Sequence, residues 1–217
     1  MNGYFDPRFK CPFTCVISGG TGSGKTTFVV ELLRHEKDMF DKPLERIIYC
    51  YGEYLQETFD SVREFRPDLE VIQGLPDIEF DKNINNLVII DDLMDDGLKS
   101  KIVSDLFTRG SHHKNVNVIF ITQNIFQNSQ FSSSIARNSK YTIIFKNPRD
   151  EAQILYLGRQ MFARNGRILL DAYKDAVQLP HGYILYDSDQ QTPDNLRLRT
   201  NVLPFQRPEI VYQPKNG

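Results

Sequence analysis

Eight consecutive residues near the N-terminus have the types and spacing of a phosphate-binding loop. They are Gly19-Gly20-Thr21-Gly22-Ser23-Gly24-Lys25-Thr26, which satisfies the pattern G-x-x-x-x-G-K-[ST]. Glycine lets several backbone N–H groups point into one concavity and lets phosphate oxygens approach them. In such a loop the lysine reaches the β- and γ-phosphates, and the threonine hydroxyl binds Mg²⁺. The motif therefore predicts a site for ATP and Mg²⁺, in which the nucleotide is bound by Gly20, Thr21, Gly22, Ser23, Gly24, Lys25, Thr26 and Thr27.

The residues on either side of this loop fit the structure that the motif requires. Residues 13–17 read as a short buried strand, and residues 26–33 have the spacing of an amphipathic helix. A helix that starts at the loop adds the positive end of its dipole to the same phosphates. A chance glycine-rich turn is the alternative, and the two matching flanks disfavour it.

Two carboxylates follow a second apolar stretch. Residues 87–90 are four consecutive apolar residues, typical of a strand buried on both faces, and Asp91 and Asp92 come directly after them. Ligands of open α/β sheets bind at the carboxyl ends of the strands. Asp91 is placed to hold the Mg²⁺ shell, and Asp92 to orient and polarise the attacking water. The alternative for Asp92 is a solvated turn carboxylate, because Asp95 and Asp96 follow closely.

A third strand is expected over residues 116–121, and it ends in Thr122, Gln123 and Asn124. If this strand lies between the strand before the loop and the strand before Asp91, its tip can contact both the γ-phosphate and the water. Gln123 is then the γ-phosphate sensor. A glutamine at the end of a strand is otherwise ordinary, so this prediction depends on the strand order.

Composition favours one globular domain. The chain has 217 residues, 40% of them hydrophobic and 25% charged, with a formal net charge of −2 that does not favour bulk attraction to nucleic acid. Three cysteines are an odd and sparse set, which suits a reducing compartment. The chain shows neither an apolar run of about 18 residues nor a signal peptide, so we expect an intracellular protein without a membrane span.

The hydrophobic patterns predict an α/β fold: a mostly parallel central sheet flanked by helices, with extra C-terminal strands. Further strands are expected at residues 46–51, 69–72, 141–145, 182–187 and 196–202, and helices at 55–65, 98–109, 154–162 and 168–177. The alternation of Leu and Arg in residues 196–199 suggests an edge strand with one solvent-facing side. We divide the chain into a lead-in (1–12), one P-loop domain (13–203) and a tail without regular structure (204–217).

Several of these segments together resemble a known family. Residues 18–26, 87–94, 109–113 and 119–124, with later segments at 141–150, 160–162 and 171–173, resemble the DNA-packaging ATPases of Maverick/Polinton elements, adintoviruses and virophages. These belong to the FtsK-HerA superfamily and are related to the poxvirus-type packaging ATPase. The likeness covers about residues 13–203. The P-loop is shared by many ATPases, whereas the Asp-Asp and Thr-Gln strand ends are more discriminating in combination.

The resemblance implies a RecA-like sheet in a homo-oligomeric ring that uses ATP to move double-stranded DNA into a capsid. Its partners would be the viral genome and a capsid or portal vertex, at a nuclear or cytoplasmic assembly site of a host cell or with the virion. Arg109 would reach a neighbouring subunit as an arginine finger, with Arg137 and Arg149 as rivals; its alternative role is to cap a helix C-terminus. The DNA-contacting residues stay open between Lys99, Lys101, Lys146 and Arg149.

Two other classes of function remain open. A P-loop phosphotransferase resembling a nucleotide kinase would need an acceptor pocket and an Arg-rich lid, neither of which can be located in the sequence. A nucleotide-dependent switch or scaffold would bind ATP without productive turnover, and the short side chain of Asp92 is compatible with that. A GTPase is disfavoured, because no Asn-Lys-x-Asp motif is present.

Overall fold

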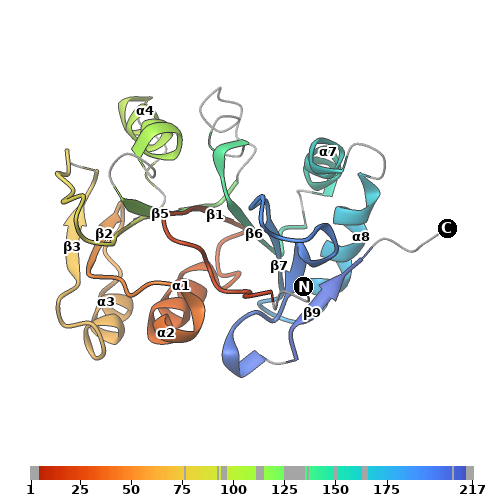
Figure 1. Ribbon diagram of the computed structural model, residues 1–217, viewed down its shortest axis with the longest axis horizontal. Coiled ribbons are helices and arrows are strands. Elements are labelled where there is room, and N and C mark those ends of the chain that lie inside the picture. The colour runs from red at the N-terminus through yellow and green to blue at the C-terminus, as the bar shows by residue number, and fades with distance from the viewer. Residues whose placement is uncertain are drawn as a thin grey trace.

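A sheet of nine strands runs through the described part of the chain, in the order β3-β2-β4-β5-β1-β6-β7-β8-β9 (Figure 1). The first six strands of this order pair in parallel, and the last three are antiparallel additions. The strands are β1 (Thr14–Ser18), β2 (Arg46–Tyr51), β3 (Glu70–Gln73), β4 (Asn86–Asp91), β5 (Val116–Thr122), β6 (Tyr141–Phe145), β7 (Tyr183–Asp187), β8 (Leu198–Thr200) and β9 (Ile210–Tyr212). β5 therefore lies between β1 and β4, as the assignment of Gln123 required.

The computed structural model describes residues 5–75, 77–91, 93, 97–110, 115–124, 135, 137–148, 151–162, 166–206 and 208–213. For residues 97–100, 109 and 110 it describes the backbone alone. None of the helices in these ranges is long and apolar enough to cross a membrane.

Helices cover both faces of the sheet. On one side in Figure 1 lie α1 (Lys25–Arg34), α2 (Glu36–Met39) and α3 (Gln56–Arg63). On the other side lie α4 (Gly97–Asp105), which continues into a π-helical turn (Leu106–Gly110), α7 (Glu151–Met161) and, towards the antiparallel strands, α8 (Arg167–Ala176). Two short 3₁₀ turns, Asp194–Leu196 and Pro204–Gln206, flank β8.

Alternating side chains of the central strands supply two different cores. In β4, Leu87 and Ile89 pack with the α1 and α3 side chains, whereas Val88 and Ile90 pack with the α4 side chains. Because successive side chains of a strand point to opposite faces, a strand covered on both sides must be apolar at every position. This explains the uninterrupted apolar run before Asp91. A third cluster, at α7, α8 and the antiparallel strands, extends the core along the sheet.

The predicted fold class is confirmed: the structure is an α/β fold with a mostly parallel central sheet and extra antiparallel C-terminal strands. Two details were wrong. Residues 204–217 were expected to lack regular structure, but β9 forms within them and pairs with β8. β8 was expected to be an edge strand with one wet side, yet β7 and β9 flank it and Arg199 is buried.

Arg199 is buried because it forms a network of ion pairs and hydrogen bonds. Its guanidinium donates to Asp187 Oδ2 at 3.2 Å, to Glu209 Oε1 at 3.0 Å and to the carbonyl oxygen of Pro7 at 3.3 Å. Thr192 Oγ1 donates to the same Asp187 oxygen at 2.9 Å. Burial raises the pKa of Asp187 above its ordinary value. The network therefore ties β7, β8, the lead-in and the segment before β9 together around one buried cation.

Arg199→Ala should lower the free energy of unfolding by about 3–5 kcal/mol, because Asp187 would be left buried without its cation. The folded state, with its raised pKa at Asp187, binds a proton more tightly than the unfolded chain does. Without the cation, burial raises this pKa further in the variant than in the unmutated protein, so the loss should shrink when the pH is lowered and the carboxyl becomes neutral. Urea unfolding at neutral and mildly acidic pH measures both effects.

The matched control is Arg167→Ala, which removes an exposed pair with Asp171 at 3.8 Å and should cost less than about 1 kcal/mol. An Arg199→Ala loss no larger than that of the control would contradict the structural role of the network.

Candidate functional site

The phosphate-binding loop joins the carboxyl end of β1 to the start of α1. Gly22 and Gly24 have φ angles of 72° and 102°, in the left-handed region that side chains disfavour. Gly24 is also the residue that caps α1, and its carbonyl oxygen accepts the N–H of Phe28 at 2.9 Å. The glycines at these two positions are therefore required by the backbone itself, and they let the loop turn directly into the helix N-terminus.

Lys25 is folded back over this loop. Its Nζ donates to the carbonyl oxygens of Gly19 at 2.7 Å and Gly20 at 3.0 Å. The ammonium group therefore lies at the loop, where phosphate oxygens are expected to bind.

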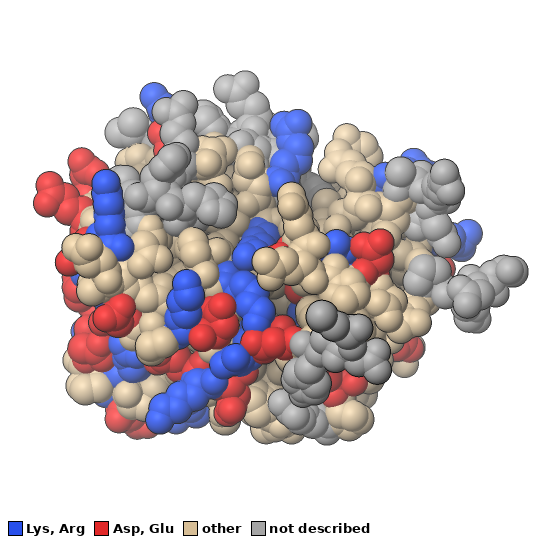
Figure 2. Space-filling view, viewed as in Figure 1, with Lys and Arg blue, Asp and Glu red and all other residues tan. Residues whose placement is uncertain are grey.

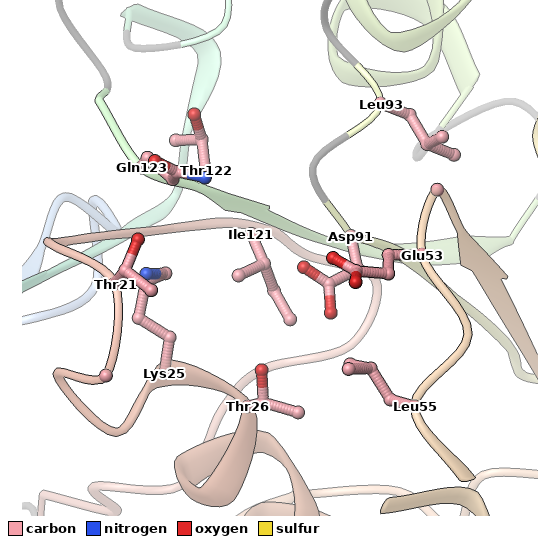
Figure 3. A pocket seen from close by; sticks show the side chains of 12 residues that line it. Thr21, Lys25, Thr26, Glu53, Leu55, Asp91, Leu93, Ile121, Thr122 and Gln123 are labelled. Atoms are coloured by element: carbon pink, nitrogen blue, oxygen red, sulfur yellow. The ribbon is translucent and has the colours of Figure 1, made fainter.

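A cavity of about 470 Å³ opens beside the loop (Figure 3). Its lining comes from the loop, from the start of α1 and from the carboxyl ends of β2, β4 and β5. The lining residues are Thr21, Gly22, Lys25, Thr26, Gly52, Glu53, Leu55, Asp91, Leu93, Ile121, Thr122 and Gln123. In Figure 3 the Asp91 and Glu53 carboxylates point into the cavity from the side opposite Lys25.

A buried hydroxyl holds the Asp91 carboxylate in place. Tyr49, two residues before the end of β2, donates its phenol O–H to Asp91 Oδ2 at 2.7 Å. Burial, together with the neighbouring Asp91 charge, raises the pKa of Tyr49 far above its ordinary value, so the phenol stays a donor. One oxygen of Asp91 is thus fixed by the protein, and the carboxylate is oriented towards the cavity.

The structure brings half of the twelve predicted site residues together at one cavity. Thr21, Gly22, Lys25, Thr26, Asp91 and Gln123 all line the same cavity. Gly20, Ser23 and Gly24 complete the loop without lining the cavity, and the exposed Thr27 does not line it.

Other predicted residues could not be placed in the site. Asp92 and Arg149 lie outside the described residues, and Arg109 lies in the π-helical turn, where only the backbone is described. Arg137 is described and exposed. The assignments of Asp92 and of the arginine finger therefore stay predictions.

Glu53 is a cavity residue that the sequence analysis missed. It follows β2 by two residues, and Tyr51 at the end of β2 is the register partner of Asp91. The ring of Tyr54, the next residue, packs on Tyr51 at 5.4 Å and on Phe59 at 5.2 Å between centroids, which anchors this loop. The available signal was a carboxylate just after a predicted strand, but its meaning depends on β2 lying next to β4.

The oxygen atoms that line this cavity suit a phosphate ligand that binds together with a metal ion. Within the described residues, no group of three or more His, Cys, Asp or Glu could hold a metal ion alone. Mg²⁺ is instead commonly held by one or two protein oxygens together with water and substrate phosphates, and Thr26 and Asp91 supply such oxygens.

Comparisons with known proteins add a likeness of fold. No protein-family model and no curated protein matches the chain. One similar solved structure is the genome packaging NTPase B204 from Sulfolobus turreted icosahedral virus 2 in complex with ATP-gammaS, with 13% identity, a TM-score of 0.47, and 97% of this chain and 99% of that chain covered. Another is the assembled ATPase EscN from the enteropathogenic E. coli type III secretion system, with 13% identity, a TM-score of 0.44, and 66% and 45% covered. Likenesses this distant indicate no function for this chain.

Tyr49→Phe should lower the free energy of unfolding by about 1.5–3 kcal/mol, because it removes a buried hydrogen bond to a charged acceptor. Chemical denaturation measures the loss. Tyr54→Phe, which changes a half-exposed ring in the neighbouring loop, is the control and should have an effect within about 0.5 kcal/mol. Equal stabilities of the Tyr49→Phe variant and the unmutated protein would show that the phenol does not anchor Asp91.

Proposed function

We propose that this protein is a Mg²⁺-dependent ATPase that moves double-stranded DNA during packaging of a viral or virus-like genome. The observation that supports the ATPase part is the convergence of Lys25, Thr26, Asp91 and Gln123 on one cavity beside a glycine-rich loop. These side chains come from the start of one helix and from the ends of two parallel strands, and each has the chemistry that phosphoryl transfer requires at its position.

The residues divide the work of phosphoryl transfer among them. Lys25 would exchange its carbonyl partners for phosphate oxygens and offset the charge that develops on them. Thr26 and Asp91 would hold Mg²⁺, which would neutralise charge on the phosphates. Gln123, at the tip of β5, would bind the γ-phosphate and sense its loss. The fixed orientation of Asp91 reduces the rearrangement needed when substrate enters.

A carboxylate must also orient the attacking water. The sequence predicts Asp92 for this role. Glu53 is a rival, because its carboxylate lines the cavity beside Asp91. Either side chain could accept a hydrogen bond from water and polarise it towards the γ-phosphate.

The DNA and ring parts of the proposal are supported by the family resemblance of the sequence segments. The face drawn in Figure 2 shows Lys and Arg interspersed with Asp and Glu, in keeping with a net charge of −2. Among its described residues, this face therefore has no broad basic surface for binding DNA. Binding of DNA would instead depend on a few residues that line the pore of an assembled ring. In that ring Arg109 would complete the site of a neighbouring subunit.

ATP turnover should rise with protein concentration and be stimulated by duplex DNA, because assembly brings each site its neighbour's arginine. Lys25→Ala should reduce turnover by at least about 100-fold, since it removes a charge that stabilises the transferring phosphoryl group. Lys37→Ala, at an exposed position of α2, is the control and should leave the rate unchanged. Transfer of phosphate to an acceptor nucleotide would instead favour a kinase, and binding of ATP without turnover would favour a switch or scaffold.

Asp92→Asn should leave the Kd for ATP unchanged and slow single-turnover hydrolysis by about 10²–10⁴-fold, the usual contribution of a general base. The Glu53→Gln variant should hydrolyse ATP within a few-fold of the unmutated rate. Glu57→Gln is the control, because it makes the same change at an exposed position of α3, and its rate should also stay within a few-fold. Quenched-flow measurements with labelled ATP distinguish binding from hydrolysis. The opposite pattern, slow hydrolysis in Glu53→Gln alone, would transfer the water-orienting role from Asp92 to Glu53.

A further inference from the structure

The turn between α8 and β7 packs against the phosphate-binding loop. His181 Nδ1 lies 3.2 Å from the carbonyl oxygen of Ser23. Because a carbonyl oxygen only accepts, the proton in this contact is on Nδ1. The same imidazole covers Gly24 so closely that a Cβ added there would lie 3.0 Å from Nδ1. Segments almost 160 residues apart in sequence are thus in direct contact at the loop.

The backbone of this turn is held in one conformation. His181 has a φ of 61°, which is uncommon for a residue with a side chain. The N–H of Gly182 donates to the carbonyl oxygen of Leu179 at 3.1 Å, and a Cβ at Gly182 would lie 2.2 Å from the carbonyl oxygen of Ala176. Such a sparsely populated geometry persists only where the surroundings enforce it, and it often marks a functional site.

Unlike the core, this turn presents its side chains to solvent. His181 is exposed, and Leu179, two residues earlier, is 75% exposed. The most exposed large apolar side chain in the described part of the chain therefore lies two residues from the imidazole that contacts the loop.

The strand order determines which end of a nucleotide would reach this turn. The cavity that would hold the γ-phosphate is lined from β4 and β5, on one side of β1. On the other side of β1 lie β6 and then β7. The loop packs closely against the end of β6, because a Cβ added at Gly19 would lie 2.6 Å from the Cβ of Phe145. A nucleotide with its γ-phosphate at Asp91 and Gln123 therefore extends its nucleoside end towards β6 and the α8–β7 turn.

We propose that residues 179–182 form a wall of the nucleoside subsite, on which the purine base of the bound nucleotide packs against His181 and Leu179. This inference rests on the proposed nucleotide-binding function. If so, the turn that leads into the antiparallel C-terminal strands contacts the substrate directly. The contact is made to the face of the base, so it recognises a nucleoside and contributes nothing to the binding of a bare phosphate chain.

The test compares ATP with inorganic tripolyphosphate, which has the phosphates and lacks the nucleoside. Equilibrium binding of each is measured in Mg²⁺ without turnover, at low temperature, for the unmutated protein, His181→Ala, Leu179→Ala and Lys25→Ala. Stacking of a base on a ring contributes about 1–3 kcal/mol, so His181→Ala should raise the Kd for ATP on the order of tenfold. Its Kd for tripolyphosphate should stay unchanged. Leu179→Ala should show the same selectivity with a smaller change.

Tyr156→Ala is the matched control, because it removes a 59% exposed ring from α7 and should alter neither Kd. Equal weakening of ATP and tripolyphosphate by His181→Ala would mean that the imidazole only braces the loop, and would overturn the inference. An unchanged Kd for ATP in both turn variants would also overturn it. Failure of the unmutated protein to bind either ligand, or binding that Lys25→Ala leaves intact, would overturn the proposed function itself.

Discussion

The in-register parallel pairing of β1, β5, β4 and β2 is the constraint on which the candidate site depends. Ser18 pairs with Thr122, Asp91 pairs with both Ile121 and Tyr51, and so the four strands end at nearly the same level. A slip of one residue would reverse the facing of every side chain in a strand. Because these strands are buried on both faces, the register is fixed by two separate cores, and the positions of Asp91 and Gln123 relative to the loop follow from hydrophobic packing.

Within that frame, the site is held ready by local contacts. Left-handed glycines shape the loop, the loop carbonyls hold the Lys25 ammonium, and the Tyr49 phenol holds one oxygen of Asp91. Preorganised charges of this kind need little rearrangement when charge develops on a substrate. The C-terminal extension contributes through His181 on one side of the loop, and the buried Arg199 network fastens the outermost strands of that extension to the rest of the sheet.

The sequence predicted the loop, Asp91 and Gln123 because each is identified by its position after an apolar strand, and parallel strands bring such positions together. Glu53 and Tyr49 were not predicted, because their roles depend on β2 being the neighbour of β4, which no local pattern specifies. β9 was missed because it has only three residues, too few for a period to show, in a segment bounded by Pro208 and Pro214. The burial of Arg199 was missed because its partners, Asp187 and Glu209, lie 12 and 10 residues away and only tertiary structure brings them together. Asp92 and Arg109 remain assignments from sequence.

The central claim is that the loop and the strand-end oxygens form one site for a magnesium-bound triphosphate. Isothermal titration calorimetry of the purified protein with a non-hydrolysable ATP analogue, with Mg²⁺ and then with EDTA, tests this most directly. The account predicts saturable binding of one analogue per chain that is markedly tighter with Mg²⁺, because Thr26 and Asp91 act on the nucleotide through the metal. Absence of saturable binding, or an affinity that does not respond to Mg²⁺, would contradict it.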